Sequence, residues 1–297
     1  MRQGLGRAVA AFFLITAPVL ALNERDWSAF NWSVADERFG GLSGFDWVDA
    51  AEGRFVALGD RGLFVTGRVV RDGAGQITGV ADMVLFPVRN PDGAQVTGRD
   101  ADSEGLAIRG DGRLFLTFEG HHRMWTYRDT GSEAAWMPRD LSFRSLHGNA
   151  GLESLAIAPD NSLFTITEDT RTRQGDFPVY RYARGAWQNA GTLPRRGDYL
   201  ITGADFGPDG YLYVLERGFS GIFGFRSRVR RFEWTGRALR EIDTVMQSPT
   251  SRHGNLEGLA VSRTPDGKIR LTMVADDNFL RLLRTEIVEY TLQESLD

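Results

Sequence analysis

Three glutamates stand at the start of similar short apolar segments, where a strand of a folded domain would begin. They are Glu104 in "DSEGLAI", Glu153 in "GLESLAI" and Glu257 in "NLEGLAV". In the first two copies a turn and a second strand follow, and that strand closes on another acid, Glu119 or Glu168. Carboxylates gathered at one place repel each other unless a cation compensates them. In a chain without cysteine, oxygen ligands favour Ca²⁺ or Mg²⁺ over zinc.

Five copies of one hairpin pattern carry these acids. The copies align at Ser43, Glu104, Glu153, Thr202 and Glu257, with spacings of 61, 49, 49 and 55 residues. Each copy combines an apolar strand, a turn such as "GDGR" or "GPDG", and an aromatic strand. A period near 50 residues with β-type content is typical of propeller blades. We therefore expect an all-β protein, a β-propeller of five blades, or of six if residues 62–103 hide a divergent copy.

The ends of the chain predict how the ring closes. Only 40 residues follow Glu257, enough for the second and third strands of a last blade. The segment "WSAFNWSVADERF" (27–39) resembles the run that precedes the third copy. We expect this N-terminal strand to join the last blade as its outer strand, which would leave no open sheet edge.

Antiparallel pairing places the two sets of acids at one end of every blade, because the first strand starts beside the end of the second. The first ring would contain Glu104, Glu153 and Glu257, with Ser43 and Thr202 as oxygen partners. The second would contain Asp60, Glu119, Glu168, Asp169, Glu216, Asp276 and Asp277. We predict a Ca²⁺ site at the channel mouth, held mainly by the three glutamates, with Asp60 and Glu168 as further ligands. The alternative is that these acids cap strands or pair with arginines between blades.

Histidines and arginines near the same positions are candidates for catalysis. The four histidines are His121, His122, His147 and His253, and we favour His253 and His121 as acid–base groups. Arg61 and Arg217 follow second-ring acids directly and could bind a phosphate or carboxylate. Salt bridges to the acid ring are the alternative role for both arginines.

The N-terminus and the composition bound the class of protein. Residues 1–21 carry two arginines, an apolar run and a final Ala21, which predicts a signal peptide or, alternatively, a retained anchor. Residues 22–297 would then form a single exported domain, periplasmic or secreted. Loss of Arg2 and Arg7 changes the formal charge from −4 to −6, which disfavours nucleic acid and anionic membranes as partners. No cysteine is present, and we expect a monomer that acts on a small molecule.

The motifs "GGLSGFDW", "ALGDRG", "DSEGLAI", "GLESLAI", "TEDT" and "NLEGLAV" resemble the bacterial phytase-like family known for "esterase-like activity of phytase". The resemblance covers nearly the whole mature chain and implies a β-propeller that hydrolyses a phosphomonoester or related ester. Propeller lactonases are similar in placing a calcium ion at the channel mouth. Ser43 and Thr202 depart from the acidic pattern. The alternatives are a lactonase or carboxylesterase, and a non-enzymatic propeller that binds a partner.

Overall fold

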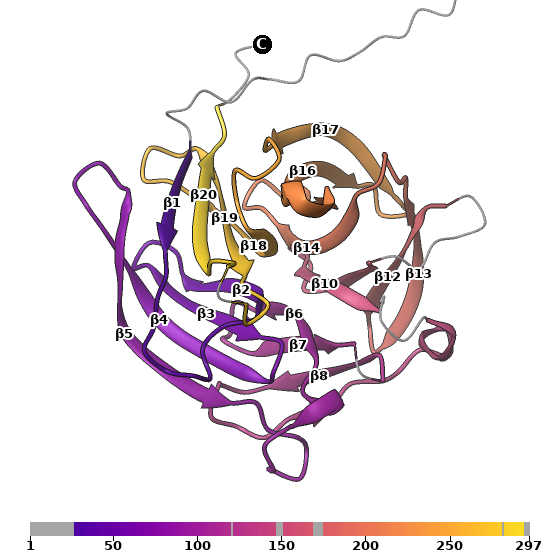
Figure 1. Ribbon diagram of the computed structural model, residues 1–297. Coiled ribbons are helices and arrows are strands. Elements are labelled where there is room, and N and C mark those ends of the chain that lie inside the picture. Colours follow the sequence, from indigo (N-terminus) through magenta and orange to yellow (C-terminus); the bar gives the residue numbers. More distant parts are fainter. Residues whose placement is uncertain (1–26, 120, 147–150, 169–174, 281, 294–297) are drawn as a thin grey trace, which may run out of the picture.

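The chain forms five four-stranded antiparallel sheets arranged around one axis, as a five-bladed β-propeller (Figure 1). The computed structural model describes residues 27–119, 121–146, 151–168, 175–280 and 282–293. The expected signal peptide, residues 1–21, lies outside them. Within the described residues, no helix has the length and apolar character needed to cross a bilayer. The five-blade prediction is confirmed, because residues 62–103 supply the outer strands of the first blade rather than a sixth sheet.

Each blade is given from its innermost strand outward. Blade 1 contains β2 (Leu42–Asp49), β3 (Arg54–Gly59), β4 (Leu63–Arg71) and β5 (Ile77–Pro87). Blade 2 contains β6 (Ser103–Ile108), β7 (Leu114–Phe118), β8 (Arg123–Tyr127) and β9 (Ala135–Trp136). Blade 3 contains β10 (Leu152–Ile157), β11 (Leu163–Thr167), β12 (Phe177–Ala183) and β13 (Ala186–Leu193). Blade 4 contains β14 (Leu200–Phe206), β15 (Leu212–Phe219), β16 (Phe225–Trp234) and β17 (Leu239–Gln247). Blade 5 contains β18 (Asn255–Arg263), β19 (Ile269–Asp276), β20 (Glu286–Thr291) and β1 (Trp27–Asn31).

The ring closes between the two ends of the chain. Strand β1 pairs with β20 in register from Trp27 opposite Tyr290 to Asn31 opposite Glu286. Figure 1 shows the indigo β1 lying beside the yellow β20. This pairing confirms that the N-terminal strand is the outer strand of the last blade, and it covers an edge that would otherwise be open.

Among the described residues, short 3₁₀ helices occur in three of the connections. They are η1 (Gly98–Asp100) between blades 1 and 2, η2 (Leu141–Ser145) between blades 2 and 3, and η3 (Gly221–Phe223) between β15 and β16. Because η1 leads directly into β6, it brings the connecting segment to the mouth of the central channel.

The hydrophobic core is divided into layers between neighbouring blades. Leu58 of blade 1 and Leu116 of blade 2 belong to one buried cluster, and Phe164 of blade 3 and Val214 of blade 4 to another. The strands alternate so that one face of each sheet packs on the previous blade and the other on the next. This packing holds the inner strands β2, β6, β10, β14 and β18 around the channel, as Figure 1 shows.

Candidate metal centre at the channel mouth

The five aligned residues of the repeat all lie at a β-bulge at the start of an inner strand. The ladder between the first two strands shifts register at the same place in every blade. The residues at the shift are Ser43, Glu104, Glu153, Thr202 and Glu257, which we call the inner ring. A bulge leaves its extra residue outside the ladder and redirects its side chain. The structure thus places these five residues at equivalent positions, as the sequence alignment predicts.

A small residue follows every member of the inner ring because the inner strands approach each other closely there. A Cβ at Gly203 would lie 2.3 Å from the carbonyl oxygen of Glu257, and one at Gly258 would lie 2.8 Å from the backbone of Gly44. The cavity left in the channel at this level has a volume of only about 10 Å³. That space holds at most about one water molecule, so the channel is closed just below the acids.

The two hydroxyl residues of the inner ring connect neighbouring blades. Ser43 donates a hydrogen bond of 2.6 Å to the carbonyl oxygen of Ser103 in blade 2. Thr202 donates one of 3.1 Å to the carbonyl oxygen of Leu256 in blade 5. The hydroxyl groups of Ser43 and Thr202 therefore donate their hydrogen bonds within the protein, whereas the three glutamates place carboxylates at the mouth.

A second ring lies at the ends of the second strands, and its membership differs from the sequence prediction. In each blade, one residue at the end of the second strand pairs through its backbone with the start of the inner strand. Its partner is either the first residue of the inner strand or the residue just before it. The five residues at the ends of the second strands are Asp60, Glu119, Glu168, Arg217 and Asp276, which we call the outer ring. The prediction that Glu216 belongs to it is wrong. Glu216 lies one residue earlier, fully buried, and pairs with Arg228 and Arg230.

Three carboxylates from blade 2 come together where the rings meet. One oxygen each of Asp102, Glu104 and Glu119 lies within 4.8 Å of the other two. Asp102 precedes β6 and faces Glu119, whose backbone N–H donates a 2.9 Å hydrogen bond to the Asp102 carbonyl oxygen. The sequence analysis missed Asp102. The sequence feature that indicates this residue is a polar side chain two positions before the glutamate of the repeat. It is Asp102 in "DSEGLAI" and Asn255 in "NLEGLAV".

The pKa values of these carboxyls are raised, first by burial and then by repulsion. Burial and the neighbouring charges of Glu153 and Glu257 raise the pKa of Glu104 well above its ordinary value. Burial and the charge of Asp102 raise the pKa of Glu119 to about 7. Burial likewise raises the pKa of Asp102, the third member of the group. Such a group of oxygen ligands is well suited to a hard divalent cation.

Arg217 supplies positive charge on the opposite side of the mouth. Its Nη2 donates a 2.7 Å hydrogen bond to Glu168 Oε1, and its Nη1 donates one of 2.7 Å to Glu257 Oε1. Asn255 also donates to Glu257 Oε1, at 2.8 Å. The predicted ligands Glu168 and Glu257 are therefore already bridged by a guanidinium, whereas the group around Glu104 is not part of that bridge.

Asp60 and Arg61 lie where blade 1 meets blade 2, beside Asp102. Burial, followed by the charge of Asp276, raises the pKa of Asp60 to about 7, and its Oδ1 has no hydrogen-bond partner among the described residues. Arg61 forms an isolated backbone bridge with Asp102, and its guanidinium carbon lies 3.3 Å from the centre of the Phe279 ring. Arg61 is exposed, and its positive charge partly offsets the rise in the pKa of Asp60.

Comparison with known proteins gives the family of this chain. The family model for phytase-like proteins, described as "esterase-like activity of phytase", matches residues 37–279. The chain belongs to the phytase-like family. The match covers blades 1 to 4 and the strands β18 and β19 of blade 5, and it confirms the resemblance found in the repeat motifs.

No curated protein matches this phytase-like chain. Similar solved structures include a glucose dehydrogenase, with a TM-score of 0.49, 11% identity and coverage of 90% of this chain and 100% of that one. A virginiamycin B lyase from Staphylococcus aureus has a TM-score of 0.46, 10% identity and coverage of 85% and 83%. A gluconolactonase from Xanthomonas campestris has a TM-score of 0.44, 15% identity and coverage of 85% and 86%. These scores are too low to support a statement about the reaction.

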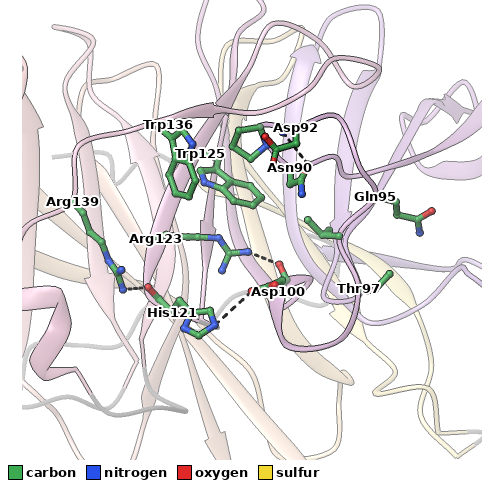
Figure 2. A pocket seen from close by; sticks show the side chains of 12 residues that line it. Asn90, Asp92, Gln95, Thr97, Asp100, His121, Arg123, Trp125, Trp136 and Arg139 are labelled. Atoms are coloured by element: carbon green, nitrogen blue, oxygen red, sulfur yellow. Dashed lines mark hydrogen bonds and ion pairs between the residues drawn. The ribbon is translucent and has the colours of Figure 1, made fainter.

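Neither of the two preferred histidines is a member of the carboxylate group of the phytase-like protein. His253 is buried, and its Nε2 lies 2.7 Å from the hydroxyl oxygen of Tyr290 while its ring packs edge-on against Trp27. Burial lowers the pKa of His253 to about 4. His121 lies two residues after Glu119, with its side chain exposed and directed to a separate pocket (Figure 2). The predicted residues His147 and Asp169 lie outside the described residues.

Proposed function

We propose that this phytase-like protein is a Ca²⁺-dependent hydrolase of phosphomonoesters or related esters, with its active site at the channel mouth. The observation that carries the proposal is the group of three carboxylates around Glu104. They lie close together, they are partly buried, and their pKa values are raised, which is a costly arrangement unless it serves a ligand. Membership of the phytase-like family supports the same class of reaction.

Asp102, Glu104 and Glu119 are the residues that would hold the cation, with Glu153 beside them. All three offer oxygen atoms, and the neighbouring blade offers the buried Asp60 Oδ1, for which the described part of the chain provides no hydrogen-bond partner. A bound Ca²⁺ would polarise the phosphoryl or carbonyl oxygen of the ester and favour ionisation of a water molecule. This assignment shifts the centre of the predicted site from the three inner-ring glutamates toward blade 2.

The remaining roles follow from charge and exposure. Arg61 is an exposed residue whose guanidinium lies over the Phe279 ring and whose charge acts on Asp60, so we assign to it the stabilisation of negative charge that develops on the substrate. Arg217 bridges Glu168 and Glu257, so it acts by positioning those carboxylates. Asp60, with a pKa of about 7, can accept or release a proton near neutral pH.

Export is part of the proposal. The apolar run within residues 1–21 would direct the chain out of the cytoplasm and would then be removed after Ala21. Periplasmic and extracellular fluids contain far more free Ca²⁺ than the cytosol. Ca²⁺ affinities of extracellular modules are in the range of about 10⁻⁴–10⁻³ M, which a partly exposed carboxylate site can reach.

Calorimetric titration of Ca²⁺ into chelator-treated protein tests the metal site, with Glu104→Gln, Glu119→Gln and the exposed control Glu52→Gln. We expect the first two variants to bind Ca²⁺ at least about tenfold more weakly and the control to bind as the wild type does. Because the substitutions also remove repulsion, Glu104→Gln and Glu119→Gln should melt at a higher temperature than the wild type in chelator. A substitution that damages the fold would lower the melting temperature, so damage cannot explain weaker Ca²⁺ binding together with a higher melting temperature. Absence of Ca²⁺ binding by the wild type would overturn the site.

Hydrolysis of 4-nitrophenyl phosphate, 4-nitrophenyl acetate and glucono-δ-lactone tests the reaction. We expect Ca²⁺-dependent turnover of the phosphate ester, lost in Glu104→Gln and reduced in Arg61→Gln. Turnover of the lactone or acetate alone, unaffected by Arg61→Gln, would make the protein a lactonase or carboxylesterase. Ca²⁺ binding without turnover of any of the three would support a propeller that binds a partner and contradict a hydrolase of these esters.

A further inference from the structure

A second cavity opens beside the acidic mouth, on the outer side of blade 2. It has a volume of about 460 Å³ and lies between the segment that joins blades 1 and 2 and the strands β8 and β9 (Figure 2). Two of its lining residues connect it to the mouth along the chain. Asp100 precedes Asp102 by two residues, and His121 follows Glu119 by two residues. A ligand in this cavity would therefore be held next to the carboxylate group.

One wall of the cavity is aromatic. Trp136 lies on the short edge strand β9, and 68% of its surface is exposed. Trp125 on β8 is buried and meets Trp136 edge to face, with ring centroids 5.5 Å apart at an angle of 90°. This contact holds Trp136 in place while leaving much of its surface open to a ligand. Figure 2 shows both indoles on the same side of the cavity.

The facing wall is polar. It consists of Asp92, Gln95 and Thr97 from the connecting segment, together with Asp100 at the end of η1. Asn90 shapes this wall, because its Oδ1 accepts hydrogen bonds from the backbone N–H groups of Asp92 and Ala94. The side chains of Asp92, Gln95 and Thr97 are exposed, so their donors and acceptors are available to a ligand.

The end of the cavity nearest the mouth has a constrained backbone. His121 has φ of 71° and His122 has φ of 34°, both in the left-handed region that non-glycine residues seldom adopt. Arg139 donates hydrogen bonds to the carbonyl oxygens of both residues, and it also lines the cavity. Figure 2 shows Arg139 and His121 together at this end. Strain of this kind persists where the surrounding structure enforces it, and such sites are frequent at ligand clamps.

We propose that this cavity binds a pyranose ring of a sugar, and that the ring belongs to the substrate. A pyranose has an apolar C–H face and a polar rim. The face would stack on Trp136, whose π-cloud attracts polarised C–H groups, and the hydroxyls would bond to Asp92, Gln95 and Asp100. A flat aromatic ligand fits less well, because it would desolvate those polar side chains without replacing their hydrogen bonds. That the sugar is part of the substrate rests on the proposed function. Binding of the ring itself does not.

Ligand-observed saturation-transfer NMR tests the binding of the ring. The probes are the methyl β-glycosides of glucose, galactose and glucuronic acid, added to wild-type protein in chelator. We expect saturation of the protons on one face of the ring, for at least one of the three sugars. Trp136→Ala should weaken binding about tenfold, since an aromatic stack contributes on that order, whereas Leu141→Ala, which removes an exposed apolar side chain elsewhere, should not.

The choice of probes separates the outcomes. A response to the glucuronide alone would support the proposal and would indicate that the cavity binds an acidic sugar, with Arg139 facing the carboxylate of that sugar. Absence of response to all three sugars, or a response that survives Trp136→Ala, would overturn the proposal. So would saturable binding of 4-nitrophenol without binding of any glycoside. Because chelator is present, failure of the Ca²⁺ site and failure of the sugar site are recorded separately.

Discussion

Arg217 donates a 2.7 Å hydrogen bond to Glu168, although the two residues occupy the same position in consecutive blades. In the other four blades that position carries a carboxylate, so blade 4 alone contributes a cation to the outer ring. The consequence is an asymmetric mouth. One side holds carboxylates neutralised from within the protein, and the other side, on blade 2, holds the group around Glu104.

Removal of the guanidinium should expose the charge that it neutralises. In Arg217→Gln, Glu168 and Glu257 lose their bridge, and we expect the metal-free protein to lose about 2–4 kcal/mol of stability at pH 8. We also expect tighter Ca²⁺ binding, because the mouth becomes more negative. Urea unfolding and calorimetry measure the two effects. Arg240→Gln, which removes an exposed arginine of equal charge, is the control. Equal Ca²⁺ affinity in both variants would contradict the electrostatic role of Arg217.

The stability of the metal-free protein should fall as pH rises. In the folded chain the pKa is raised to about 7 for Asp60 and Glu119 and to about 8 for Glu257, whereas unfolded carboxyls titrate near 4. Between these values the folded state holds more protons, so the free energy of unfolding decreases from pH 5 to pH 8. Each fully shifted group contributes up to about 1.4 kcal/mol per pH unit.

Bound Ca²⁺ should remove this pH dependence of the free energy of unfolding, because the cation replaces the protons as the charge that compensates the carboxylates. Urea unfolding at pH 5, 6, 7 and 8, with chelator or with Ca²⁺, measures it, and Ca²⁺ titrations near pH 6 should release protons to the buffer. A metal-free protein whose stability is constant or increases over this range would show that the mouth carboxylates are not repelling each other.

The close approach of inner strands at the bulges should make their glycines intolerant of a side chain. In Gly203→Ala the new Cβ would lie 2.3 Å from the Glu257 carbonyl oxygen, so one of the strands must move. We expect a loss of about 2–4 kcal/mol in the free energy of unfolding. Gly110→Ala, where a Cβ meets open space, serves as the control. If both variants unfold at the same urea concentration, the small residue of the motif has another role.

His253 should contribute to stability at neutral pH. Burial lowers its pKa from 6.5 to about 4, so the neutral ring stabilises the folded chain above pH 6.5 and that contribution is lost as pH falls toward 4. His253→Gln should lose about 1–3 kcal/mol at pH 7 through the bond to Tyr290, and much less at pH 4. Ca²⁺ affinity should not change. A variant that binds Ca²⁺ and keeps its stability but loses turnover would instead give His253 the catalytic role predicted from the sequence.

The repeat could be predicted well from the sequence because its information is local. Turn residues such as those of "GDGR", the alternation of each hairpin and the 49-residue spacings define a blade without reference to the rest of the chain. The inner ring follows from the same hairpin, since Glu104, Glu153 and Glu257 occupy one place in a repeated local structure. Even closure by residues 27–31 could be inferred, because the last blade lacks a strand.

The composition of the site depended on tertiary structure. The register of the hairpin decides that Arg217 faces the mouth while Glu216 is buried among arginines. A register shifted by one residue would exchange the two side chains, and the sequence is compatible with either register. Asp102 joins Glu104 and Glu119 only through backbone pairing across a hairpin, and His253 leaves the mouth because Trp27 and Tyr290, distant in sequence, enclose it. The sequence by itself determined the propeller and its acidic rim, since these are sums of local preferences. Which carboxylates converge was decided by the exact register within a hairpin, and which are neutralised was decided by contacts between blades, such as those of Arg217 with Glu168 and Glu257.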